Sequence, residues 1–203
     1  SVTISRRKIF RKKGFIYKVY NDWYNLIKNH LPLHMHNGIV IEMGSGAGFI
    51  KETIPGTITS DVMFLPFVDI VMDGLDLPFL TNSVDCLVLM DVFHHISNAD
   101  LFFNEAIRIL RRGGRIIMIE PWINRWSLWV YSNLHHEAID ISTDSWDFTS
   151  SGPLSGANQA LPWIVFDRDR RIFEEKYPVL KIKEICPMMP FLYLLSGGFK
   201  YNL

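Results

Sequence analysis

The chain alternates short hydrophobic runs with segments whose hydrophobic residues recur at helical spacing. Residues 39–41 and 86–90 are continuous apolar runs, as expected for strands that are buried on both faces of a parallel sheet. Residues 57–60, 67–72 and 115–120 predict three more strands. Because these strands alternate with helical segments, the pattern predicts an α/β fold with a mostly parallel sheet.

Helical periodicity is clearest in residues 15–27 and in the segment that runs from Ser97 to the glycines at 113–114. Ser97 is the expected N-cap of the second of these helices. A short helix is expected over residues 48–54, and residues 122–134 predict a helix with a large apolar face.

The last part of the chain is less regular. Residues 140–163 are rich in Ser, Thr, Asp, Gly and Pro, and a polar stretch of this length is more often functional than empty. Asp167 is the expected cap of a short helix that ends before Pro178. Residues 179–185 alternate apolar and charged side chains, which predicts an exposed or edge strand.

A length of 203 residues suits a single α/β domain. Within it we expect a basic, amphipathic lead over residues 1–36, a cofactor-binding core over 37–121, and an acceptor-side and C-terminal segment over 122–203. The lead is expected either to cover the ligand cleft or one sheet face, or to touch an anionic surface, and the covering role is favoured.

The overall composition argues against several classes of protein. Twenty-one basic and 21 acidic residues cancel, so no global field selects nucleic acid, and no nucleic-acid recognition motif is present. Two cysteines predict neither a disulfide framework nor a cysteine-based metal site, which is typical of a cytoplasmic protein. No apolar run approaches the length of a transmembrane helix. A start at Ser1 without a signal-peptide pattern predicts a trimmed or partial chain.

A glycine-rich turn, Gly44-Ser45-Gly46-Ala47-Gly48, directly follows the first predicted strand. Glycine tolerates positive φ and lets a ligand approach the backbone closely. A nicotinamide-binding G-x-G-x-x-G turn would need glycine where Phe49 stands, and the Lys-Ser/Thr pair of a phosphate-binding Walker loop is absent. This spacing disfavours a nicotinamide oxidoreductase. A plain strand-to-helix turn is the alternative interpretation.

Acidic residues stand at the ends of three predicted strands. Glu42 ends the first, Asp61 follows the second, and Asp73 follows the third. The carboxyl ends of parallel strands form the ligand-binding edge of such a sheet. Asp61 is therefore a candidate acceptor for the hydroxyls of a ribose, with a helix cap or turn as its alternative role. For Asp73 the alternative is a solvated acid in a turn.

In chain order, several motifs together resemble class I S-adenosylmethionine (SAM)-dependent methyltransferases of the small-molecule, quinone- and sterol-methylating type. They are Glu42, the three glycines, Asp61, Asp73-Gly74, Leu77-Pro78-Phe79, His94-His95 and Arg111-Arg112-Gly113-Gly114. The resemblance covers residues 39–121. It implies a Rossmann-like, doubly wound, mostly parallel sheet of the seven-stranded type, whose last strand is either missing or supplied by residues 191–195.

The resemblance also implies SAM as cofactor and a small-molecule, lipid or glycan methyl acceptor. It implies a cofactor site made of Glu42, Gly44, Ser45, Gly46, Gly48, Asp61, Val62, Met63, Asp73, Gly74, Leu75 and Met90. In this assignment the glycine turn, Glu42 and Met90 surround the methionyl part, Asp61 holds the ribose, and the remaining residues contact adenine. A non-catalytic module that binds SAM or another nucleoside and acts through partners is the alternative function.

The candidate bases are His94, His95, His135, His136, Glu137 and Asp144, of which His95, His135 and His136 are the candidate catalytic residues. For the pair His94-His95 a structural or cofactor-orienting role is favoured. A hydroxyl acceptor would need a base, whereas an activated carbon or sulfur needs less help. Adjacent histidines do not share a helix face, so we expect no metal site.

We expect the acceptor to bind between the carboxyl edge of the sheet and residues 122–163, with residues 15–27 as a partial lid. Trp126, Trp146 and Trp163 are the predicted aromatic walls. If the chain is cut short, an exposed apolar tail would contact a membrane or a second copy of the chain, as a peripheral membrane protein or homodimer. Removal of the Asp61 carboxylate is expected to weaken cofactor binding and to leave the fold intact.

Overall fold

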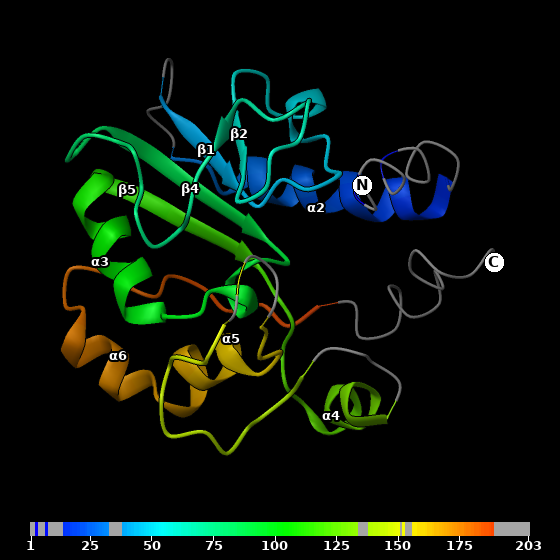
Figure 1. Ribbon diagram of the computed structural model, residues 1–203, viewed down its shortest axis with the longest axis vertical. Helices are drawn as coiled ribbons and strands as arrows, with labels where there is room; N and C mark the ends of the chain where they lie inside the picture. Colours follow the sequence, from blue (N-terminus) through cyan, green and yellow to red (C-terminus); the bar gives the residue numbers. More distant parts are fainter. Residues whose placement is uncertain are drawn as a thin grey trace.

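Five parallel strands form the centre of the structure, a computed structural model that describes Thr3, Arg7 and residues 14–32, 38–133, 138–150, 152 and 156–188. In chain order the strands are β1 (Val40–Met43), β2 (Ile58–Asp61), β3 (Ile70–Val71), β4 (Val84–Met90) and β5 (Leu110–Ile119). Their spatial order is β3-β2-β1-β4-β5 (Figure 1).

The strand order reverses direction beside β1. The chain moves outward from β1 to β2 and β3, then returns to the other side of β1 with β4, so that Ile41 pairs in parallel with Ile58 on one side and Leu87 on the other. This is the topological switch point of a doubly wound Rossmann-like sheet, where ligands bind beyond the carboxyl ends of the strands. The predicted fold class is confirmed. Residues 191–195, the candidate last strand, lie outside the described residues.

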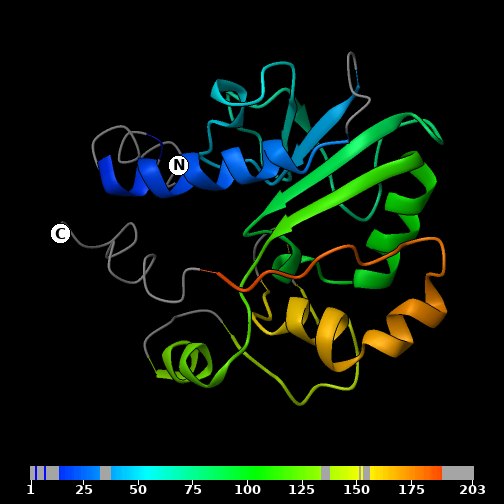
Figure 2. The same cartoon turned by 180° about the vertical axis from the view of Figure 1, so that it is seen from behind.

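Successive residues of the central strands face two separate hydrophobic layers, because side chains alternate along a strand. Ile41 and Leu87 pack in the layer that contains α3 (Ala99–Ile109). Val40 and Cys86 pack in the layer that contains α2 (Gly14–Asn29). Figure 2 shows α2 on one side of the sheet and α3 on the other. Burial raises the pKa of the Cys86 thiol to about 12, as expected for a core cysteine.

The helix predicted over 48–54 is only one 3-10 turn, η1 (Ile50–Glu52). The sheet face that such a helix would cover is covered by α2, whose Tyr24 is fully buried. The rings of Tyr17 and Tyr24 lie 4.5 and 5.2 Å from the ring of Phe49, centroid to centroid. Helix α2 is therefore a cover of the sheet that also packs directly on the end of the glycine turn.

Helix ends differ from the sequence prediction in two places. The N-cap of α3 is Asn98, whose side chain accepts a hydrogen bond from Leu101 N, and not Ser97. Asp167 lies inside the π-helical segment η3 (Ile164–Arg168), which follows α5 (Leu161–Trp163), and Asp169 is the N-cap position of α6 (Arg170–Lys176). The helix predicted over residues 122–134 begins later than predicted, as α4 (Arg125–Asn133).

The strand predicted over residues 179–185 is wrong, because these residues form no strand. Leu180 and Ile182 pack against the hydrophobic layer that contains α3, α5 and α6. The alternating pattern therefore reflects one side that faces this layer and one that faces solvent. A strand would also need a neighbouring edge to bond with.

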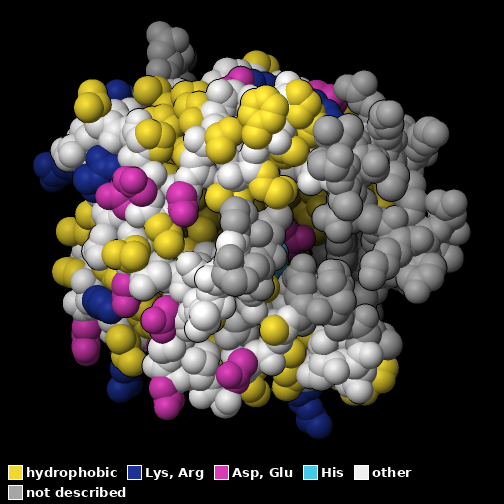
Figure 3. Space-filling model, in the orientation of Figure 1, with side chains coloured by type: hydrophobic (Ala, Val, Ile, Leu, Met, Phe, Trp, Pro, Cys, Tyr) yellow, Lys and Arg dark blue, Asp and Glu magenta, His cyan; other side chains and the backbone are white. Residues whose placement is uncertain are grey.

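Hydrophobic side chains also reach the surface. Phe64, in the loop between β2 and β3, and Leu80, in the loop between β3 and β4, are 82% and 81% exposed. Figure 3 shows hydrophobic side chains gathered over the part of the surface formed by β2 and its neighbouring loops. On α4, Trp126 and Trp129 stack with ring centroids 5.6 Å apart. None of the described helices is both long and apolar enough to cross a bilayer.

Candidate functional site

The glycine turn is held against the end of β2 by backbone hydrogen bonds. Ser45 N donates to Ser60 O at 2.7 Å, and Gly48 N donates to Ser45 O at 2.7 Å. Gly44 and Gly46 have φ of 60° and 49°, in the left-handed region that favours glycine. The turn is thus rigidly placed at the switch point between β1 and β4.

The three glycines are needed for different reasons. A Cβ on Gly44 would lie 2.5 Å from the Val92 side chain, and a Cβ on Gly48 would collide with the Tyr24 hydroxyl. Around Gly46 the nearest atom would be 3.7 Å away. Packing within the protein therefore explains Gly44 and Gly48, whereas Gly46 has positive φ and room for a Cβ at ordinary contact distance.

Glu42 is the most unusual side chain at this edge. It is 1% exposed, and neither carboxylate oxygen has a hydrogen-bond partner among the residues that the structure describes. Burial raises its pKa to about 7, while the neighbouring Ser45 and Tyr24 hydroxyls act in the opposite direction. The pKa of Tyr24 is in turn raised well above its usual value by burial first and by the Glu42 charge second. A buried carboxylate without a partner is costly, so this position suits a cationic ligand group.

Asp61 is 6% exposed and already bonded through both oxygens. Its Oδ2 accepts from Gly46 N and its Oδ1 from Met63 N, each at 3.0 Å. Each oxygen keeps a second lone pair, so the ribose role stays a prediction. These two hydrogen bonds give Asp61 a structural role that the sequence did not reveal. They argue against the expectation that the fold stays intact when the Asp61 carboxylate is removed.

Asp73 and Gly74 also have local structural roles. Asp73 is exposed, and its Oδ1 accepts from Leu75 N at 2.9 Å, which forms an Asx-type turn. A Cβ on Gly74 would lie 2.7 Å from Met43 Cε. Their proposed contacts with adenine stay predictions, as do those of the half-buried Val62, Met63, Leu75 and Met90. The fold does bring the predicted cofactor residues to the carboxyl ends of neighbouring strands.

The turn after β4 depends on Glu120, a residue that the sequence analysis missed. Its Oε1 accepts from Val92 N at 2.9 Å and from Phe93 N at 2.7 Å, and its Oε2 lies 2.8 Å from His94 Nδ1. The side chains of His94 and Glu120 are only 2% and 4% exposed. The available signal was an acid at the end of the fifth strand, the same position that Glu42 occupies on the first.

Of the candidate catalytic histidines, the structure describes His95 but not His135 or His136. His95 Nδ1 lies 3.1 Å from Gly156 O, and its ring centroid is 4.2 Å from that of His94, so His95 joins β4 to the later polar segment. His135, His136 and Glu137 lie outside the described residues.

Of the predicted aromatic walls, Trp146 is 8% exposed and donates its Nε1–H to Asp169 at 2.8 Å. It is therefore part of the core. Trp163 is partly buried against the same layer, whereas Trp126 is 42% exposed.

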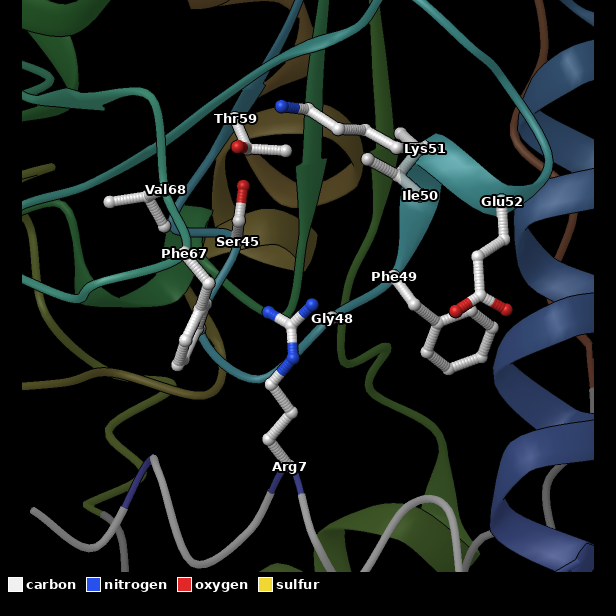
Figure 4. A pocket seen from close by; sticks show the side chains of 11 residues that line it. Arg7, Ser45, Gly48, Phe49, Ile50, Lys51, Glu52, Thr59, Phe67 and Val68 are labelled. Atoms are coloured by element: carbon white, nitrogen blue, oxygen red, sulfur yellow. The ribbon is translucent and has the colours of Figure 1, made fainter.

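One pocket of about 350 Å³, counting the solvent at its mouth, borders the glycine turn. Ser45, Gly46 and Gly48 form one wall, Phe67 and Val68 another, and Arg7 reaches in from the N-terminal lead (Figure 4). The Arg7 guanidinium carbon lies 4.1 Å from the centroid of the Phe67 ring.

Comparison with known proteins agrees with this architecture. Residues 56–118 match the family model described as a Methyltransferase domain. This match and the strand order support the resemblance to class I SAM-dependent methyltransferases that the sequence motifs predicted. SAM is the methyl donor of this class.

Among individual proteins, the chain is similar to the ubiquinone/menaquinone biosynthesis C-methyltransferase UbiE of Sinorhizobium fredii and of Rhizobium meliloti. Each is 28% identical over 75 residues, which are 37% of this chain and 25% of the relative. The matched segment thus spans only a quarter of these curated relatives.

Similar folds occur among solved structures. Geranyl diphosphate C-methyltransferase from Streptomyces coelicolor has a TM-score of 0.42 at 15% identity, covering 58% of this chain and 54% of its own. Phosphoethanolamine N-methyltransferase 2 from Haemonchus contortus has a TM-score of 0.40 at 15% identity, covering 55% of this chain and 32% of its own.

Proposed function

We propose that this chain binds SAM at the carboxyl edge of β1, β2 and β4 and transfers its methyl group to a small-molecule, lipid or glycan acceptor. The observation that carries the proposal is Glu42, which adjoins the glycine turn and whose two buried oxygens have no hydrogen-bond partner in the described part of the chain. The ammonium of an amino-acid end is a cation that would satisfy such a carboxylate.

Bound SAM supplies an electrophilic sulfonium methyl group, so most of the difficult chemistry belongs to the cofactor. The residues of the chain would hold and orient it. The turn at 44–48 offers its backbone to the methionyl part, and Asp61 has lone pairs left for the ribose. Met90 and residues 62–63 and 73–75 complete the proposed site, within a cofactor-binding core over 37–121.

An acceptor that needs little help from a base fits this site best. His94 is bonded to Glu120, and His95 faces Gly156 O, so the two histidines after β4 already have structural partners. An activated carbon or sulfur loses its proton readily, unlike a hydroxyl. The UbiE relatives are named as C-methyltransferases, which supports a carbon acceptor. A role for His95, His135 or His136 as base would apply to a hydroxyl acceptor.

The proposal includes a cytoplasmic location. If the acceptor is a lipid, peripheral contact with a membrane would bring the enzyme to its substrate. A homodimer is compatible with a cytoplasmic location and with membrane contact. The acceptor itself would bind between the sheet edge and residues 122–163, where α4 exposes Trp126 and Trp129.

Calorimetry with SAM, S-adenosylhomocysteine and NAD(H) tests the cofactor. We expect binding of the first two and not of NAD(H), and at least tenfold weaker binding of both by Glu42→Gln, with the exposed Glu174→Gln as matched control. Transfer of a labelled methyl group to fractionated lipid, glycan and small-molecule pools then tests the activity. Binding without transfer to any pool would favour the non-catalytic module, and NAD(H) binding without S-adenosylhomocysteine binding would reject the proposal.

A further inference from the structure

A second charged group lies beside the glycine turn. Arg7 is half-buried in the pocket that Ser45, Gly46 and Gly48 line, and its guanidinium packs on the Phe67 ring. Figure 4 shows the guanidinium directed toward the turn between Phe67 and Gly48. A guanidinium carries five N–H donors, so its contact with the ring leaves donors for a ligand.

Arg7 has no ion-pair partner within the part of the chain that the structure describes. The other charged groups of the pocket are engaged. Lys51 Nζ lies 2.6 Å from Asp69 Oδ2, and Glu52 Oε2 accepts a hydrogen bond from the Tyr17 hydroxyl at 3.0 Å. Of the described cations of this pocket, Arg7 is therefore the one without an ion-pair partner among the described residues, and it can meet an anion.

In the described part of the chain, the glycine turn thus has a carboxylate without a hydrogen-bond partner at its start and a guanidinium without an ion-pair partner beside it. Gly48 lies between Arg7 and the neighbourhood of Glu42. It lines the pocket that Arg7 enters, and it also packs on the hydroxyl of Tyr24, which neighbours Glu42. A ligand with an α-amino-acid end carries both an ammonium and a carboxylate. One such end would satisfy both protein groups, and a guanidinium binds a carboxylate through two parallel hydrogen bonds.

We propose that Arg7 of the N-terminal lead binds the carboxylate of the ligand's amino-acid end, opposite Glu42 and its ammonium. The inference rests on the proposed function, since the methionyl part of SAM is such an end. It gives the basic lead a specific binding role, and it makes Arg7 the residue by which the site distinguishes a complete cofactor from a nucleoside that lacks the amino acid.

The test compares two ligands that differ in this one feature. S-Adenosylhomocysteine carries the amino-acid end, whereas 5′-methylthioadenosine has the same nucleoside and thioether without it. Calorimetry with the full chain and with Arg7→Ala should show a loss of S-adenosylhomocysteine affinity of roughly 10- to 100-fold and unchanged affinity for 5′-methylthioadenosine. Arg7→Lys should keep part of the affinity, because an ammonium retains the charge but not the two-bond geometry.

Lys51→Ala is the matched control, since it removes a cation of the same pocket that Asp69 already pairs. It should leave both affinities unchanged. Equal S-adenosylhomocysteine affinity of Arg7→Ala and wild type would overturn the role of Arg7 and leave the proposed function standing. Equal losses for both ligands would also overturn it, because Arg7 would then support the pocket as a whole. Failure of the wild-type chain to bind S-adenosylhomocysteine would overturn the proposed function, and this inference with it.

Discussion

Replacement of Glu120 should destabilise the turn after β4 more than any other single truncation at the sheet edge. The buried carboxylate accepts two backbone N–H groups, from Val92 and Phe93, and pairs with His94 Nδ1. Asp91, directly before them, has a φ of 60°, which is a costly conformation for a residue other than glycine. The bonds to Glu120 hold the chain in this conformation.

The magnitude follows from what the Glu120→Ala variant leaves behind. Two backbone amides and one imidazole would stay buried without their acceptor, at about 1–3 kcal/mol for each group. Removal of one member of a buried, bonded pair typically costs about 3–5 kcal/mol. We therefore expect the free energy of unfolding to fall by about 3–5 kcal/mol, a large share of the roughly 5–15 kcal/mol that a domain has.

Glu120→Gln is the informative partner variant. Its amide oxygen can still accept from Val92 N and Phe93 N, and its amide nitrogen can donate to His94 in the other tautomer. It should lose only about 1–2 kcal/mol, the difference between a charged and a neutral acceptor.

Urea unfolding followed by circular dichroism measures both Glu120 variants. Glu174→Gln, which breaks only the exposed pair with Arg170, is the control and should stay within about 0.5 kcal/mol of wild type. Wild-type stability of Glu120→Ala would refute the reasoning, and so would equal losses in the Ala and Gln variants.

Three further predictions concern the cofactor edge. The pKa of Glu42 in the folded chain, about 7, exceeds its ordinary value of 4.5, so the wild type should lose stability as pH rises from about 4.5 through 7. Glu42→Gln, which cannot ionise, should therefore be more stable than wild type by roughly 3 kcal/mol near pH 8 and should lose this advantage near pH 4.5. Urea titrations at both pH values measure this difference. Gly48→Ala should cost about 1–3 kcal/mol through its clashes with the Tyr24 hydroxyl and Ser45 O. The same change should cost less in a Tyr24→Phe background, measured against Tyr24→Phe alone because that variant also loses the bond from Phe49 N; equal costs in both backgrounds would contradict the packing argument. Asp61→Ala should cost about 2–4 kcal/mol, because Gly46 N and Met63 N lose their acceptor, and an unchanged urea midpoint would show that these bonds contribute little.

The strands and the turn at 44–48 could be predicted because their signals are local. A run such as 86–90 is apolar throughout only if both of its faces are buried, and this property does not depend on which helix covers each face. The acids at 42, 61 and 73 could be placed at one edge because parallel strands share a direction. The class of the domain followed from the order of these local signals.

Tertiary structure decided which surfaces meet. Periodicity predicted an apolar face for residues 15–27, but only the folded chain shows that this face replaces the helix expected over 48–54. It likewise places Trp146 in the core and leaves residues 179–185 without a strand partner.

The same distinction applies within the site. The sequence by itself determined the residue types at the ligand edge, because each follows directly from a strand end. Which of them have partners depends on contacts between distant segments: Glu120 meets a turn 26–28 residues before it, and Gly48 meets Tyr24 of α2. Hydrogen-bond partners require positions to within a few tenths of an ångström, and only packing of the whole chain sets those positions.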